Sequence, residues 1–148
     1  MLSSAIIVVV VGTMVGVEFA VAVFVEPIFN RLPLEAGIAA RSDGARVLGR
    51  VMPFWYVASL ILVVGWSLFT WGQPPSTPTL ISAILLAVSV VLSILFLVPI
   101  NSRIRRWSAG EVPDDWREQM RRWNRLHYLR VAILIAAFVL AAVALTMV

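Results

Sequence analysis

The sequence predicts an all-α membrane protein: an antiparallel bundle of four transmembrane helices with a protruding cytoplasmic hairpin between helices 3 and 4. Of its 148 residues 61% are hydrophobic, well above the roughly 45 to 50% of a soluble domain. Four apolar stretches have lengths near the roughly 20 residues that a helix needs to cross a hydrocarbon core. They form one domain, residues 1–148, and cover residues 2–25, 51–71, 80–100 and 131–148.

The positive charges predict the orientation. All twelve are Arg, and all lie in residues 31–50 or 103–130. Because cationic loops stay in the cytoplasm, we expect connections 1 and 3 there and both termini outside, in the bacterial inner (plasma) membrane. Membrane topology and attraction to anionic lipid headgroups then explain the Arg residues, so nucleic acid is not an expected partner. The absence of Cys excludes disulfide exchange and thiolate-bound clusters on this chain.

The first stretch is expected to remain as a spanning helix, because no cation or small-residue cleavage motif marks it as a removed signal. Gly12 and Gly16 form a small-xxx-small pair that would suit helix packing, including a homo-oligomer. Glu18 follows at membrane depth, where a carboxylate needs a partner or a wet cavity. Glu26 precedes Pro27 and is expected at the membrane interface.

The connection from Ile28 to Gly49 is long for a helical bundle, so it is expected to form short helices over the cytoplasmic face, with a lid as one option. Pro53 should kink or open the second spanning helix near its start. Trp55 and Tyr56 follow it. Such a pair is more typical of an interfacial aromatic belt than of a ligand site, although both options stay open.

In the third helix Pro99 should cause a kink that presents Asn101 inward, and the helix is expected to continue to Gly110. Asp115 and Glu118 have the spacing of a capping box at the start of the fourth helix. One face of that helix collects five side chains at steps of three and four residues: Trp116, Met120, Trp123, His127 and Arg130.

The last two helices should pair outward from their turn. Trp107 then meets Trp116, Ile104 meets Met120, and Asn101 meets Trp123 or Asn124. At about 1.5 Å per residue, Arg130 lies roughly 10 Å deeper than Asn101, and Glu18 lies roughly 12 Å in from Pro27. Glu18, Tyr56 and Arg130 therefore reach a similar depth.

These groups can divide the work of a small-molecule site. Glu18 would hold Arg130 as a buried pair, His127 would accept a proton, and Asn101 with Arg130 would donate to a forming oxyanion. The alternative is a structural ion pair beside a histidine at a helix interface. A metal site is not expected, because His127 and Glu18 supply too few ligands.

The end of the third helix, Pro99-Ile100-Asn101 with Ile104 and Trp107, and the start of the fourth, Trp116, Trp123, His127 and Arg130, resemble the anthrone oxygenase-like family of small four-helix membrane proteins. Most members have no assigned function. The resemblance implies a cofactor-independent oxygenase that converts anthrones, or other phenolic or quinol-like compounds, to quinones.

With such a hydrophobic substrate, His127 would remove the ring proton, and Asn101 and Arg130 would hold the anion while it reacts with dioxygen, without a cofactor or metal. Trp55, Tyr56 and Trp123 would supply flat walls, and Asn124 completes the predicted substrate-binding set.

Two other functions remain open. A lone Glu in the first of four helices is similar to small proton-coupled multidrug exporters, although the long connections and Arg130 argue against a cationic cargo. The chain is also compatible with a non-catalytic membrane scaffold or subunit that docks through its Arg-rich hairpin.

Overall fold

The computed structural model describes residues 2–107 and 111–148, and the elements in that part of the chain are all helical. Two of them are short π-helical turns, η1 and η2, that interrupt longer α-helices. The elements are α1 (Leu2–Ala20), η1 (Val21–Val25), α2 (Glu26–Arg31), α3 (Leu34–Phe69), α4 (Ser76–Leu92), η2 (Ser93–Leu97), α5 (Val98–Ile104) and α6 (Trp116–Leu145).

Four continuous helical stretches are long and apolar enough to cross a membrane: Leu2–Arg31, Leu34–Phe69, Ser76–Ile104 and Trp116–Leu145. The prediction of an all-α protein with four spanning helices is therefore confirmed. Each observed stretch is longer than the predicted span, because helix continues into the Arg-rich sequence at one end of the molecule.

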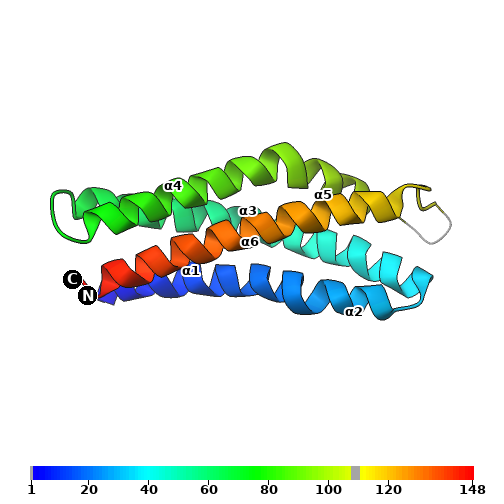
Figure 1. The fold of residues 1–148 in the computed structure, drawn as a ribbon, viewed down its shortest axis with the longest axis horizontal. Coiled ribbons are helices and arrows are strands. Elements are labelled where there is room, and N and C mark those ends of the chain that lie inside the picture. Colours follow the sequence, from blue (N-terminus) through cyan, green and yellow to red (C-terminus); the bar gives the residue numbers. More distant parts are fainter. Residues whose placement is uncertain (1, 108–110) are drawn as a thin grey trace.

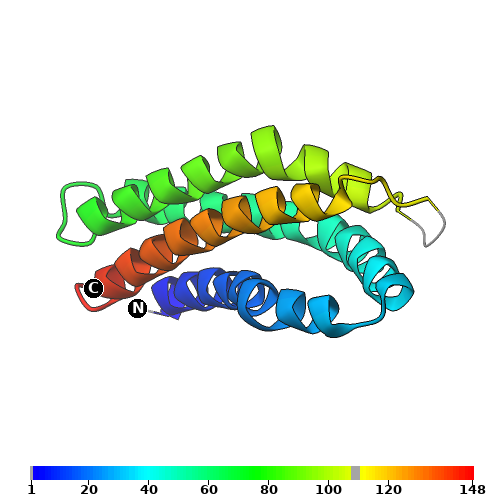
Figure 2. The same cartoon turned by 45° about the vertical axis from the view of Figure 1, so that its right-hand side comes forward.

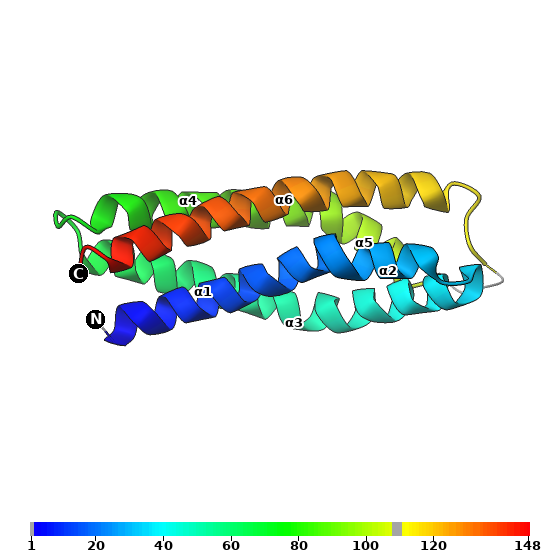
Figure 3. The ribbon, with the colours of Figure 1, turned by 60° about the horizontal axis from the view of Figure 1, so that its bottom comes forward.

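Successive stretches run in opposite directions, and both termini lie at the same end of the bundle (Figure 1). Contacts join α1 to α3, α3 to α4, α4 to α6 and α6 back to α1, which closes a four-membered ring (Figures 2 and 3). The centre is filled by apolar side chains with almost no exposed surface, among them Val11, Met14, Val63, Leu86 and Leu134.

The first connection differs from the prediction. Only Leu32 and Pro33 separate α2 from α3, and α3 has 36 residues. The expected long connection with surface helices or a lid is wrong, because its residues from Leu34 onward are the first turns of α3. Ile38 and Ala45, among other buried residues of this segment, pack at helical spacing against the α5–α6 region, and this tertiary contact stabilises helix despite its glycines.

Each π turn ends two positions before a proline, at Val25 before Pro27 and at Leu97 before Pro99. The Glu26 N–H donates to the Val21 carbonyl and the Val98 N–H to the Ser93 carbonyl, each five residues back. A proline has no N–H and its ring crowds the preceding helical turn, so one extra residue in that turn relieves the conflict. The flanking sequences share a pattern, Phe24-Val-Glu-Pro-Ile28 and Phe96-Leu-Val-Pro-Ile100.

At the far end of the bundle, α5 ends at Ile104 instead of continuing toward Gly110, which lies outside the described residues. The α2–α3 corner lies at the same end, where α6 begins (Figure 3). The predicted pairing of Trp107 with Trp116 is confirmed by an edge-to-face contact with ring centroids 6.5 Å apart.

The start of α6 is at Trp116, as expected, but its predicted capping box is wrong. Asp115 makes no side-chain cap, and its Oδ1 instead accepts a 2.9 Å hydrogen bond from Gln119 Nε2. The Asp115 carboxylate therefore accepts from the Gln119 side-chain amide and not from the backbone N–H of Glu118, which it would have capped.

The glycines of α1 face different surroundings. A Cβ on Gly12 would lie 2.7 Å from Phe138 Cε2 of α6, so Gly12 allows a close helix contact within the chain. Gly16 is exposed and meets nothing within 4 Å. The two glycines therefore do not serve one packing surface, and a homo-oligomer through them stays a prediction.

Candidate functional site

A cavity of about 270 Å³ opens between the helices beside the two π turns. Residues from both halves of the chain line it. They include Glu18 of α1, Tyr56 of α3, Ser93 of η2, Asn101 of α5, and Trp123, His127 and Arg130 of α6. Its volume is close to the lower end of the roughly 300 to 1,000 Å³ typical of ligand pockets.

Glu18 is the centre of the polar lining. Its Oε2 lies 2.7 Å from Arg130 Nη2, and its Oε1 accepts a 2.9 Å hydrogen bond from the Tyr56 hydroxyl. The residue is only 4% exposed. A buried carboxylate is tolerated when opposite charge and hydrogen bonds replace its hydration, and Glu18 has both. The expected pairing of Glu18 with Arg130 is thus observed.

Arg130 connects three parts of the site. Besides Glu18 it donates from Nη1 to Ser93 Oγ over 3.0 Å and from Nη2 to His127 Nδ1 over 3.0 Å. Its guanidinium carbon lies 5.6 Å from the centroid of the Tyr56 ring. Its Nε–H is buried and has no partner. One donor of this cation therefore has no acceptor among the described residues.

The contacts of His127 define its tautomer. Arg130 can only donate, so His127 Nδ1 accepts, and the hydrogen lies on Nε2, which donates to the Glu18 main-chain carbonyl over 3.2 Å. His127 Nδ1 also lies 3.5 Å from Glu18 Oε2. The imidazole stacks on the Trp123 indole, with centroids 4.5 Å apart and planes 20° apart. The ring is therefore fixed on both edges and on one face.

The remaining predicted residues divide into two groups. Asn101 and Trp123 line the cavity, and Trp123 Nε1 is buried without a partner. Trp55 and Asn124 do not line it. Trp55 donates from its indole to the Val10 carbonyl over 3.1 Å, and Asn124 lines a different pocket at the end of the bundle. The structure thus brings Glu18, Tyr56, Asn101, Trp123, His127 and Arg130 to one cavity and leaves two predicted residues outside it.

Ser93 is a site residue that the sequence reasoning missed. It lies in a long apolar stretch, where a single Ser gives no signal by itself. The signal was its place six positions before Pro99, since the π turn that Pro99 favours begins at Ser93. The turn brings Ser93 Oγ to Arg130, while Ser93 donates to the Ser89 carbonyl over 2.7 Å.

A second buried pair was also missed. Glu26, expected at the interface, is 7% exposed, and its Oε2 lies 3.6 Å from Arg41 Nη2. Arg41 was assigned to the first connection, but the extended α3 buries it. Its Nη2 donates to Asn30 Oδ1 over 2.6 Å, and its Nη1 donates to the Gly37 carbonyl over 3.3 Å.

The cavity has the groups for acid and base chemistry on an organic ligand. It offers an imidazole with one lone pair, a carboxylate beside it, and unpaired N–H donors on Arg130 and Trp123. Within residues 2–107 and 111–148 no three His, Asp or Glu side chains lie close enough together to hold a metal ion. The described side chains thus include groups that can bind a ligand and transfer a proton.

Comparison with known proteins gives one family. The model of a family described as anthrone oxygenase matches residues 44–140. The matched range contains Tyr56, Asn101, His127 and Arg130, whereas Glu18 precedes it. No curated protein and no solved structure matches the chain.

Proposed function

This chain belongs to the anthrone oxygenase family, and on that premise we propose that it is a membrane-embedded oxygenase of anthrone-like or other phenolic carbon acids. The observation that carries the proposal is the buried arrangement of Glu18, His127 and Arg130 on one cavity. It combines a lone-pair nitrogen, a carboxylate 3.5 Å from that nitrogen, and a cation with an unpaired N–H.

The first step is removal of the ring proton from the CH₂ carbon that lies between the two aryl rings of an anthrone. His127 accepts it at Nδ1 once Arg130 turns from this nitrogen to the substrate oxygen. Glu18 Oε2, 3.5 Å from Nδ1, stabilises the imidazolium, while the bond to the Glu18 carbonyl keeps the ring oriented. Arg130 and Asn101 donate to the oxyanion of the resulting anthrolate.

The anthrolate then reacts with dioxygen to give a hydroperoxide at the deprotonated carbon. Loss of water from this hydroperoxide gives the quinone, and the proton held by His127 leaves with that water. One oxygen atom enters the product and the other becomes water, so the CH₂ carbon loses four electrons and dioxygen gains four. Flat walls from Tyr56 and Trp123 suit a planar ring system.

The test uses the purified protein in detergent, an anthrone and air-saturated buffer. Quinone absorbance and oxygen uptake should rise in a one-to-one ratio above the rate with heat-denatured protein. His127→Ala should lower the turnover by about 100-fold or more, which is the range for loss of a general base. Trp123→Phe, at the cavity, should reduce turnover, whereas Trp55→Phe, outside it, should not.

Three results would contradict the proposal. The first is a wild-type protein that accelerates no anthrone oxidation. The second is a folded His127→Ala variant with full turnover. The third is a Glu18→Gln variant that abolishes proton-coupled efflux from vesicles while His127→Ala has no effect, which would favour an exporter.

The loop-length argument against an exporter fails, because two residues join α2 to α3, but the pairing of Arg130 with Glu18 still disfavours a cationic cargo.

A further inference from the structure

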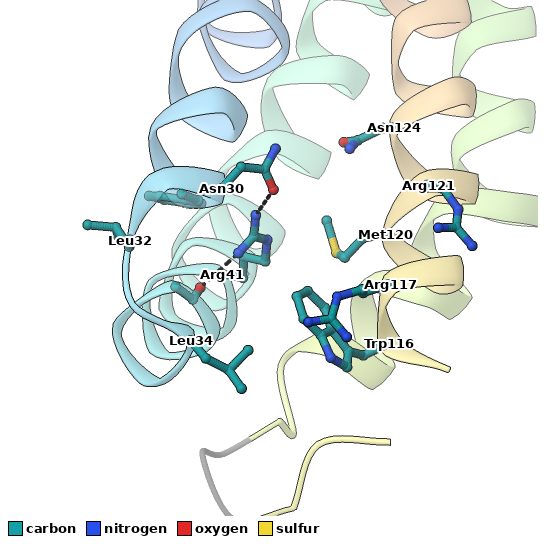
Figure 4. A pocket seen from close by; sticks show the side chains of 11 residues that line it. Asn30, Leu32, Leu34, Arg41, Trp116, Arg117, Met120, Arg121 and Asn124 are labelled. Atoms are coloured by element: carbon teal, nitrogen blue, oxygen red, sulfur yellow. Dashed lines mark hydrogen bonds between the residues drawn. The ribbon is translucent and has the colours of Figure 1, made fainter. Parts of the chain in front are cut away.

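We propose a second ligand site, which holds the phosphate of an anionic phospholipid at the end of the bundle opposite the termini. A pocket of about 430 Å³ lies there between the α2–α3 corner and the first turns of α6 (Figure 4). It shares no lining residue with the candidate cavity. The proposal therefore stands independently of the oxygenase function.

The charge of this pocket favours an anion. Three guanidinium groups line it, on Arg41, Arg117 and Arg121, together with the side-chain amides of Asn30 and Asn124. Because Arg41 is paired with the Glu26 carboxylate over 3.6 Å, the excess positive charge comes from Arg117 and Arg121. The lining contains no carboxylate. Guanidinium groups bind phosphate through two parallel N–H donors, and amides add neutral donors.

Arg41, a lining residue, has one side-chain donor without an acceptor among the described residues. Its side chain is 4% exposed, its Nη atoms bind Asn30 and the Gly37 carbonyl, and its Nε–H has no partner. Figure 4 shows its guanidinium group facing the side chains of α6 across the pocket. A Cβ on Gly37 would lie 3.2 Å from Arg41 Nη1, so this glycine leaves room for the buried cation.

The apolar part of the pocket favours a lipid over a soluble anion. Leu32 and Leu34 at its rim are exposed, and Met120 and Trp116 lie across from them. The pocket lies where one helical stretch, Leu2–Arg31, ends and two others, Leu34–Phe69 and Trp116–Leu145, begin, at the Arg-rich end of the bundle. Basic pockets between spanning helices at this level suit anionic headgroups, whose glycerol and first acyl carbons would cover the leucines.

The test measures binding of phosphatidylglycerol to the full chain in detergent by native mass spectrometry. The Arg117→Gln, Arg121→Gln double variant should bind it about tenfold more weakly, because two charge contacts to phosphate are lost. The matched control is Arg103→Gln with Arg122→Gln. It removes the same charge from exposed positions at the same end, outside the pocket, and should bind as tightly as the wild type.

Competition experiments distinguish a lipid phosphate from free phosphate. Phosphatidylcholine and millimolar inorganic phosphate should each fail to displace phosphatidylglycerol. Displacement by inorganic phosphate alone would overturn the assignment to a lipid. Equal weakening in both double variants would show attraction to the whole basic end, and full binding by the Arg117, Arg121 double variant would remove the site altogether.

Discussion

Glu18 and Arg130 join the first helical stretch to the last, whereas Glu26 and Arg41 join neighbouring segments at one corner of the bundle. The first pair lies 2.7 Å apart, and Tyr56, Ser93 and His127 complete its hydrogen bonds. The second pair is 3.6 Å apart, and Glu26 Oε2 and Arg41 Nε have no hydrogen-bond partner.

The comparison shows that a buried carboxylate–guanidinium pair can have different surroundings in the two regions. In the long-range pair every side-chain N or O atom except Arg130 Nε has a hydrogen-bond partner within the protein, and the pair lines the candidate cavity. The local pair has orphan atoms on both partners and lies beside the pocket at the Arg-rich end of the bundle. Four sets of variants would sharpen or break this comparison.

The largest effect is expected from Glu18→Gln. It leaves Arg130 buried without a countercharge, and we expect the free energy of unfolding to fall by about 3 kcal/mol. Denaturant titration of the purified protein in detergent measures it. A Glu18→Gln, Arg130→Gln double variant should recover part of the loss, because the orphan charge is gone. A loss no larger than that of Glu26→Gln would break the comparison.

Gly12→Ala should come next, because α1 and α6 hold Glu18 and Arg130 together. The new methyl would lie 2.7 Å from Phe138 Cε2, so the helices must shift or the ring must move, at a cost of about 2 kcal/mol. The control is Gly16→Ala, which meets nothing within 4 Å and should leave stability unchanged or raise it by up to about 1 kcal/mol, because Ala is the better helix former. Equal effects of the two variants would argue against this helix contact.

Ser93→Ala tests the π turn. It removes the oxygen that accepts from Arg130 Nη1, and a hydrogen bond to a charged group is worth about 1.5 kcal/mol of unfolding free energy. Ser67→Ala is the matched control, since Ser67 Oγ is buried without a partner and its removal should leave stability unchanged or raise it. If both variants unfold alike, Ser93 has no special role in holding Arg130.

The smallest effect is expected from Glu26→Gln, which makes the same chemical change as Glu18→Gln in the same helical stretch. The Glu26–Arg41 contact is longer, 3.6 Å against 2.7 Å, and Glu26 Oε2 accepts no hydrogen bond, while Arg41 keeps Asn30 and the Gly37 carbonyl as acceptors. The free energy of unfolding should therefore fall by only about 1 kcal/mol. Anthrone turnover should stay near the wild-type rate, because Glu26 does not line the candidate cavity. A loss of turnover here would mean that the local pair also belongs to the site.

Depth counting along the sequence was enough to predict that Glu18 meets Arg130, and turn geometry was enough for the contact of Trp107 with Trp116. Both succeed because a helix rises by a fixed amount per residue and a spanning segment has a fixed vertical position. The direction in which a side chain points is harder to predict from the sequence. Trp55 and Tyr56 are adjacent in sequence, and only Tyr56 reaches the cavity.

The sequence by itself determined the class of protein, the number of spanning helices and the end of the bundle that carries the Arg residues. Long apolar runs and clustered charge respond to the membrane as a solvent, whatever the helices contact. Tertiary structure decided the rest: that α3 begins at Leu34, that Glu26 and Arg41 are buried, and that Ser93 reaches Arg130. The physical reason is that weak helix formers and lone polar groups take their state from the neighbours they pack against.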